Sequence, residues 1–522
     1  MKERLDPTSI PKYVDPLPIP PVLRPRHRLF GIKHYTVKMR QVRQKLHRDT
    51  PPTTVWGYEG MYPGPTFEVR TNDIIKVKWI NRLPIFRHLL PVDRTIHGAE
   101  PPNPRVRTVV HLHGGNVPAR YDGHPEAWFT NRFLVTGPYF KNITYVYPNI
   151  QPATTLWYHD HALGITRLNV YAGLAGFYIV RDAYEDRLNL PHGPHEVPLV
   201  IQDRSFQRDG SLFYPARPED APPGARLPDP SIVPEFFGDT IVVNGKVWPY
   251  LEVEPRKYRL RFLNGSNSRF YRMRLSSGQP FYQIGTDQGF LDEPVPREEL
   301  LFGPGERLDV IVDFSDFGNE TITLLNDAPT PFPNGDPVKE GTTDQIMQFR
   351  VTLPLAGPDT SSLPSRLVPV IPLPEEAALN IRNLALVEDT DRFGRLMLML
   401  DNKRWSDPIT ERPQLGTVEI WRLINTTPDT HPIHLHLVRF QVLDRQPFDV
   451  NAYRATGEIR HAGSAARPDA GEKGWKDTVL VHPGEATRII ARFGDFTGKY
   501  VWHCHILEHE DHEMMRPYEV VR

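Results

Sequence analysis

The sequence predicts an all-β protein built from three copies of one β-sandwich domain, and two observations carry this prediction. Proline is abundant, at 55 of 522 residues, and proline is disfavoured inside helices but common in turns and at strand edges. The second observation is a strand-like pattern that occurs three times along the chain. The hydrophobic share of 39% and the charged share of 24% are ordinary for a soluble globular chain.

The three strand-like segments are residues 72–81, 255–264 and 415–425. Each alternates apolar with polar side chains at a period of two, as a half-buried strand does, and ends in asparagine. The terminal asparagines lie about 160 to 180 residues apart, which suits a domain and far exceeds the ~20–50 residues of a solenoid repeat. We therefore expect each segment to be the same strand in one of three related domains.

The domain boundaries follow from composition. A strand-like stretch ends near Asp182, and a proline- and serine-rich stretch at 353–374 is a predicted linker. The predicted domains are residues 1–182, 183–360 and 361–522. Residues 219–234 are a predicted long loop within the second domain.

Charge and termini exclude several classes of protein. The formal net charge is −1, so we expect no nucleic-acid partner and no polybasic membrane anchor. No apolar run approaches the ~18 residues of a membrane span, and the N-terminal stretch lacks the apolar core of a signal peptide. The single cysteine, Cys504, excludes an internal disulfide and fits synthesis in the reducing cytoplasm.

Of the 21 histidines, ten lie in four short clusters, at 111–113, 159–161, 431–436 and 503–509. Side chains two residues apart in a strand point to the same face. The pairs predicted to point together are His111 with His113, His159 with His161, His434 with His436, and His503 with His505. A single ion such as zinc usually takes about four ligands, so eight imidazoles predict a cluster of metal ions.

A second metal site follows from the residues that remain. Cys504 lies between two paired histidines and therefore faces the other way, as does His431, three residues before His434. With His509 and Met514 downstream, they form the two-histidine, thiolate and thioether set of a blue-copper site. Cys504 is covalently adjacent to His503 and His505, which gives electrons a short bonded path to the cluster.

The clusters also repeat between the two ends of the chain. WYHDH (157–161) aligns with VWHCH (501–505), and HLH (111–113) aligns with HLH (434–436). In this alignment Asp160 takes the place of Cys504, and Thr108 takes the place of His431. The first domain is therefore predicted to supply cluster ligands without a mononuclear site. The middle domain has neither motif, so we expect the cluster between the first and third domains, with the second as a spacer or substrate wall.

Taken together, HLHG (111–114), WYHDH, HPIHLH (431–436) and HCHILEHEDHEMM (503–515) resemble, in order, the four copper motifs of the multicopper oxidases. Within that family the chain resembles bacterial spore-coat laccases. The resemblance implies three cupredoxin-like Greek-key domains and four copper ions: one type 1, one type 2 and a type 3 pair. It assigns His431, Cys504, His509 and axial Met514 to type 1; His111 and His434 to type 2; and His113, His159, His161, His436, His503 and His505 to type 3.

The resemblance also implies the reaction and its partners. Phenols or aromatic amines would each lose one electron at the type 1 copper, and four electrons would reduce O2 to two waters. Because that reduction consumes four protons, Glu510 and Asp122 are predicted to help deliver them; with the type 1 ligand His431, they are the predicted catalytic residues. The expected state is a monomer, made without a signal peptide and assembled, by resemblance only, with other proteins of a spore coat.

Several alternatives use some of the same residues. A bilirubin-oxidase-like or phenoxazinone-synthase-like preference would need the same machinery. A metal-ion oxidase of copper tolerance would often carry a methionine-rich insert, but the 9 methionines here form no such cluster. Eight cluster imidazoles are superfluous for a copper carrier or store, and a structural zinc site would leave Met514 unexplained.

Overall fold

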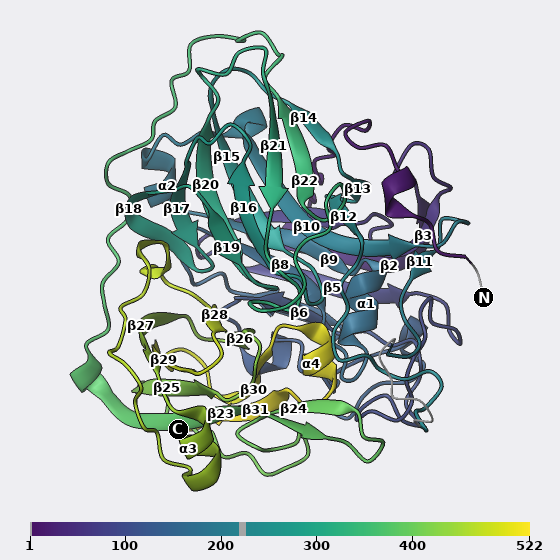
Figure 1. The fold of residues 1–522 in the computed structure, drawn as a ribbon, viewed down its shortest axis with the longest axis vertical. Coiled ribbons are helices and arrows are strands. Elements are labelled where there is room, and N and C mark those ends of the chain that lie inside the picture. The colour runs from purple at the N-terminus through teal and green to yellow at the C-terminus, as the bar shows by residue number, and fades with distance from the viewer. Residues whose placement is uncertain (1–2, 219–225) are drawn as a thin grey trace.

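The fold is seen in a computed structural model that describes residues 3–218 and 226–522. Across these residues the chain pairs into six β-sheets, with only short helices between strands. All ladders between named strands fall within three segments, at 27–181, 196–350 and 378–520. In Figure 1 the teal and green strands of the middle segment lie above the yellow-green strands of the third. The predicted all-β fold is confirmed.

Two sheets make up the first segment, in the orders β1-β2-β5-β7, with β3 on β2, and β4-β9-β8-β6. Its strands are β1 (His27–Leu29), β2 (Ile32–Gln44), β3 (Thr53–Tyr58), β4 (Gly64–Arg70), β5 (Ile75–Arg82), β6 (Val110–His113), β7 (Thr144–Tyr147), β8 (Thr154–Asp160) and β9 (Ala175–Arg181). Helices α1 (Thr166–Ala172) and α2 (Ala183–Arg187) follow β8 and β9.

The middle segment has the sheet orders β13-β12-β10-β15-β20-β17-β18, with β11 on β10, and β14-β22-β21-β16-β19. Its strands are β10 (Glu196–Phe206), β11 (Leu212–Phe213), β12 (Thr240–Val243), β13 (Lys246–Val247), β14 (Tyr250–Glu252), β15 (Lys257–Asn264), β16 (Tyr271–Leu275), β17 (Phe281–Thr286), β18 (Gly289–Arg297), β19 (Leu300–Phe302), β20 (Arg307–Asp313), β21 (Thr321–Asn326) and β22 (Gln345–Arg350).

The third segment has the orders β24-β23-β25-β29-β27 and β28-β26-β30-β31. Its strands are β23 (Ala378–Thr390), β24 (Leu396–Leu400), β25 (Val418–Asn425), β26 (His431–Leu435), β27 (Phe440–Pro447), β28 (Thr478–Val481), β29 (Glu485–Arg492), β30 (Gly498–Cys504) and β31 (Met515–Val520). Helix α3 (Val450–Thr456) follows β27, and α4 (Leu507–Asp511) connects β30 to β31.

The repeated strand pattern marks the same strand in all three segments. β5, β15 and β25 each run parallel to a long early strand of their segment, namely β2, β10 and β23. Each ends in or next to a fully buried asparagine, Asn81, Asn264 or Asn425. The asparagine Oδ1 accepts from the backbone N–H two residues on, at 2.9, 3.0 and 2.8 Å respectively. The side-chain amide thus closes an Asx turn at the end of the strand, which explains why asparagine recurs there.

The first and third segments also match in strand register. His111 pairs with His159 between β6 and β8, and His434 pairs with His503 between β26 and β30. One step along these ladders, Asp160 occupies the position that Cys504 occupies in the third segment. The register therefore confirms the sequence alignment of these two residues.

The connections contain little regular structure. Residues 353–374, the predicted linker, form neither helix nor strand, and run as the green trace along the left edge of Figure 1. Within the predicted loop at 219–234, residues 219–225 lie outside the described residues, and 226–234 form no helix or strand. The proposed boundaries at 182 and 360 fall in the gaps between the strand-paired segments. No helix in the described ranges is both long and apolar enough to cross a membrane.

Candidate metal centre

The eight paired histidines meet between the first and third segments. They lie at the ends of four strands: β6 and β8 in the first segment, and β26 and β30 in the third. All eight side chains are buried. His111 stacks on His436 with ring centroids 3.7 Å apart, and His113 stacks on His434 at 3.6 Å.

The other four rings meet in the same alternating way. Nε2 of His161 lies 3.2 Å from Nε2 of His503, and the rings of His159 and His505 are 5.4 Å apart at their centroids. Each imidazole of the first segment therefore faces one of the third. Sets of three, such as His161, His436 and His503, bring their potential ligand atoms within 4.8 Å of one another.

The hydrogen bonding of these rings fits a metal cluster. Nδ1 of His111, His159 and His434 each lies 2.6–2.8 Å from a backbone carbonyl oxygen, to which it can donate. Their Nε2 atoms, and Nδ1 of His113, have no hydrogen-bond partner among the described residues. Buried polar atoms are rarely left unpaired, and metal-bound histidines commonly donate their other ring N–H to a carbonyl or carboxylate. These imidazoles are therefore arranged as metal ligands.

The electrostatics of the pocket favour the same state. Burial, reinforced by neighbouring imidazoles, holds the pKa of His111, His161 and His503 well below the ordinary value for histidine. Burial also lowers the pKa of His159 to about 3. These four rings are thus neutral at physiological pH, which is the form that binds metal ions.

A second, separate group contains Cys504, His431 and His509. The cysteine Sγ lies 3.6 Å from Nδ1 of His431 and 3.8 Å from Nδ1 of His509. Sulfur and nitrogen ligands bound at about 2.3 and 2.0 Å with tetrahedral angles would lie roughly 3.5 Å apart, so this spacing suits one shared ion. Burial raises the pKa of Cys504 well above its ordinary value, so the thiolate needs a cation beside it.

The two adjacent methionines have different surroundings. Met514 belongs to the same buried cluster as Cys504 and Ile433, and its carbonyl accepts from the Cys504 backbone N–H at 3.0 Å. Met515 begins β31 and packs with Leu163 and Val501 in another cluster. Only Met514 therefore shares the apolar environment of the cysteine.

The two predicted acids are both buried beside the histidine cluster. Oε1 of Glu510 lies 3.2 Å from Nδ1 of His161, and neither Glu510 oxygen has a hydrogen-bond partner among the described residues. Burial, together with the nearby Asp511, raises the pKa of Glu510 well above its ordinary value. Asp122 accepts from Nδ1 of His436 at 2.7 Å through Oδ2, and its backbone carbonyl oxygen lies 2.6 Å from His111 Nδ1.

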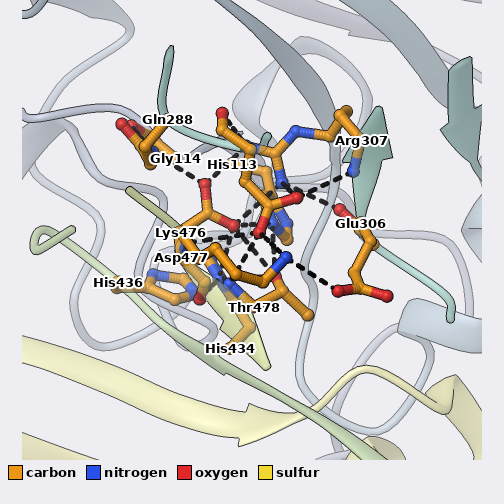
Figure 2. Close-up of polar contacts among 12 residues, drawn as sticks. His113, Gly114, Gln288, Glu306, Arg307, His434, His436, Lys476, Asp477 and Thr478 are labelled. Carbon is orange, nitrogen blue, oxygen red and sulfur yellow. Dashed lines mark hydrogen bonds and ion pairs between the residues drawn. The ribbon is translucent and has the colours of Figure 1, made fainter. Parts of the chain in front are cut away.

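Three further residues touch these groups and a fourth pairs with one of the three; all four were missed from the sequence. Thr427 Oγ1 lies 2.7 Å from Nε2 of His431, and Glu235 Oε1 lies 3.4 Å from Nε2 of His509. Asp477 lies against His113 and His434, and Arg307 is paired with Asp477 (Figure 2). The sequence carried a signal for Asp477 alone, because it lies in GWKDTVLVHPGE (474–485), which resembles a further recurrent segment of the multicopper oxidases.

The fold and these two sites define a class of protein. A thiolate–imidazole site adjoins an eight-imidazole cluster through the tripeptide His503-Cys504-His505, so electrons accepted at the first can pass along the chain to the second. Soft sulfur with imidazole favours copper, and several metal ions in one cluster suit a multi-electron acceptor. The class is a copper-dependent oxidase.

Comparison with known proteins identifies the family. Family models described as multicopper oxidase match residues 40–100, 102–185 and 378–522. The chain is 53% identical to a laccase of Bacillus stratosphericus over 98% of this chain and 100% of that protein. It is 52% identical to a laccase of Bacillus subtilis (strain 168), over 98% and 99%. The crystal structure of a laccase from Pediococcus acidilactici Pa5930 superimposes with a TM-score of 0.75 at 28% identity, covering 98% of this chain and 95% of that one.

The chain belongs to the multicopper oxidase family. Its three-part fold is cupredoxin-like, and its cofactor is copper, with four ions as the family norm. It is a laccase-like enzyme that couples the one-electron oxidation of an aromatic reductant to the four-electron reduction of O2 to water. The predicted family, fold class, activity and cofactor are confirmed.

Proposed function

We propose that the two groups of side chains divide the four copper ions between them. The mononuclear type 1 ion would be held by His431, Cys504 and His509, with Met514 as a weak axial ligand. The cluster would be held by the eight paired imidazoles: His111 and His434 on type 2, and His113, His159, His161, His436, His503 and His505 on the type 3 pair. The observation that carries this proposal is the alternation of eight buried imidazoles from two segments.

Bound copper would accept single electrons from the substrate at the first site and collect the four electrons that O2 reduction consumes at the second. The protein would do the rest. Phenols or aromatic amines would approach the outer nitrogen of His509, where Glu235 is placed to accept a hydrogen bond from a substrate O–H or N–H. Thr427 would fix the ring of His431 from behind, because its hydroxyl is in turn 2.9 Å from Oδ1 of the repeat asparagine Asn425.

Proton delivery would fall to Glu510, with Asp122 in a supporting role. Glu510 keeps a proton because of its burial, and neither of its oxygens is held by a hydrogen bond among the described residues. It could therefore give that proton to reduced oxygen and then be reprotonated. Asp122 already accepts hydrogen bonds from the rings of His436 and His111. Part of its role would therefore be to orient these two ligands. A monomeric state and assembly into a spore coat with other coat proteins are further proposals, which rest on the resemblance alone.

Glu510→Gln tests the proton role. The amide preserves the shape of the side chain but cannot cycle a proton, so reoxidation of the reduced protein by O2 should slow by at least about 100-fold. Anaerobic reduction by substrate, followed at the blue absorption band in a stopped-flow instrument, should change little. Glu513→Gln removes a carboxylate whose contact is the backbone N–H of Trp405, and should leave both half-reactions near wild type. Equal losses in both half-reactions of Glu510→Gln would contradict the proton role.

Met514→Leu and Met515→Leu test the axial ligand. A thioether donor stabilises the oxidised ion, so its loss in Met514→Leu should raise the reduction potential while the blue colour remains. Met515→Leu should leave the potential close to wild type and cost less than about 1.5 kcal/mol of stability, as isosteric core changes usually do. Redox titration of both variants at the blue band decides between them. A shift confined to Met515→Leu would reverse the assignment.

A further inference from the structure

The middle segment contributes a buried arginine to the outer layer of the histidine cluster. Arg307 opens β20, and its side chain is fully buried. Its Nη1 lies 2.8 Å from Oδ1 of Asp477, and its Nη2 contacts the other oxygen (Figure 2). Nε donates to the carbonyl of Thr155 in β8 at 2.9 Å. The guanidinium therefore joins all three segments at one point.

Asp477 passes this restraint on to two imidazoles. Its Oδ1 accepts from Nε2 of His113 at 3.0 Å, and its backbone carbonyl lies 2.8 Å from Nδ1 of His434. These are the two rings that stack at 3.6 Å, one from the first segment and one from the third.

Other groups of the middle segment complete this layer. Gln288 Nε2 donates to Oδ2 of Asp477 at 2.7 Å, and Asp287 Oδ1 accepts from the Arg307 backbone N–H at 2.8 Å. Gly114 packs closely against both side chains: a Cβ added to it would lie 2.5 Å from Oδ2 of Asp477 and 2.8 Å from Nη2 of Arg307. These contacts hold the Asp477 carboxylate in a single position.

Stability alone is a weak reason for such an arrangement. Desolvating two charges often costs as much as their attraction returns, and a buried ion pair can frequently be replaced by apolar residues without loss. What the pair does provide is geometry, since the planar guanidinium fork fixes a carboxylate through two parallel hydrogen bonds that a lysine cannot reproduce.

We propose that Arg307 is a positioning residue for the copper cluster: by holding Asp477 at both oxygens it fixes the rings of His113 and His434. The segment that supplies none of the proposed ligands would thereby set how firmly copper is held where the type 2 and type 3 ligands meet. This inference rests on the proposed ligand assignment. Loss of a partner of this kind commonly lowers metal affinity or activity by about 10–100-fold.

Arg307→Lys tests the inference, with Arg259→Lys as its matched control. Arg259 is also a buried arginine of the middle segment, with Nε 2.8 Å from Oδ1 of Asp309 and Nη2 on the other oxygen, and its further partners, Glu185 and Glu196, are not proposed ligands. The measurements are copper per chain during titration with a copper chelator, the electron paramagnetic resonance signal of the type 2 ion, the blue absorption and the unfolding temperature.

For Arg307→Lys we expect copper loss at about 10–100-fold lower chelator concentration, an altered type 2 signal and an unchanged blue band. Arg259→Lys should lower the unfolding temperature while keeping wild-type copper retention and type 2 signal. Wild-type retention and signal in Arg307→Lys, or the same changes in Arg259→Lys, would overturn the inference.

If Arg307→Lys does not accumulate folded, Gln288→Leu removes one bond to Asp477 and should shift copper retention in the same direction by a smaller factor; no shift would overturn the inference. A wild-type protein that lacks a type 2 signal would instead contradict the proposed ligand assignment, and the inference with it.

Discussion

Cys504→Ser is expected to remove the blue absorption and the oxidase turnover together. The sulfur lies 3.6 and 3.8 Å from Nδ1 of His431 and His509, the two proposed type 1 histidines, and the colour of such a site arises from the copper–thiolate bond. The same residue joins the mononuclear site to the cluster, because its neighbours in the chain are His503 and His505. A serine hydroxyl is a poor copper ligand by comparison, so both properties should fall to background in one step.

Absorption spectra, copper content and steady-state oxygen uptake measure this outcome. Serine differs from cysteine by one atom, so the variant should still fold, and an unfolding temperature near that of the wild type would show that it does. The type 2 signal should persist, because the ligands of the cluster are unchanged. A Cys504→Ser protein that stays blue would mean that the mononuclear site lies elsewhere.

His161→Ala is expected to keep the blue colour and to stop oxygen reduction. Its Nε2 lies 3.2 Å from Nε2 of His503, inside the cluster, whereas the first segment has Asp160 where the third has its cysteine. Substrate should therefore still bleach the blue band under anaerobic conditions. On addition of O2 the colour should fail to return, and oxygen uptake should fall to background.

His47→Ala provides the control for His161→Ala. His47 is also fully buried, but its ring contacts the Pro11 carbonyl and the Asp49 backbone N–H, away from the cluster. Its replacement should lower stability and leave oxygen uptake per folded molecule intact. Normal oxygen uptake by folded His161→Ala would refute the division into two sites.

Local periodicity explains why the two groups of side chains and the repeated strand could be predicted from the sequence. Histidines two residues apart share a face of a strand, and Cys504 between two of them must point the other way, so short-range spacing separated the two groups. The asparagines that end the repeated strands, such as Asn264, are buried and close the same turn in each segment, which is why the repeat was visible at all.

Residues that act through long-range contacts could not be found in this way. Arg307 and Asp477 are separated by 170 positions, and they meet only because β20 and the start of β28 are brought together by the packing of separate sheets. Glu235 reaches His509 from a region without regular structure, where no periodicity indicates the direction of a side chain. Such contacts depend on how the segments pack against one another, and the spacing of residues along the sequence does not indicate that packing.

The most direct test of this account is the copper content of the purified wild-type protein, measured together with its visible and electron paramagnetic resonance spectra. We expect four copper ions per chain, a blue absorption band from one of them, one type 2 signal, and a magnetically silent pair. A colourless protein, or one that binds a single metal ion per chain after full loading with copper, would contradict the proposed copper sites.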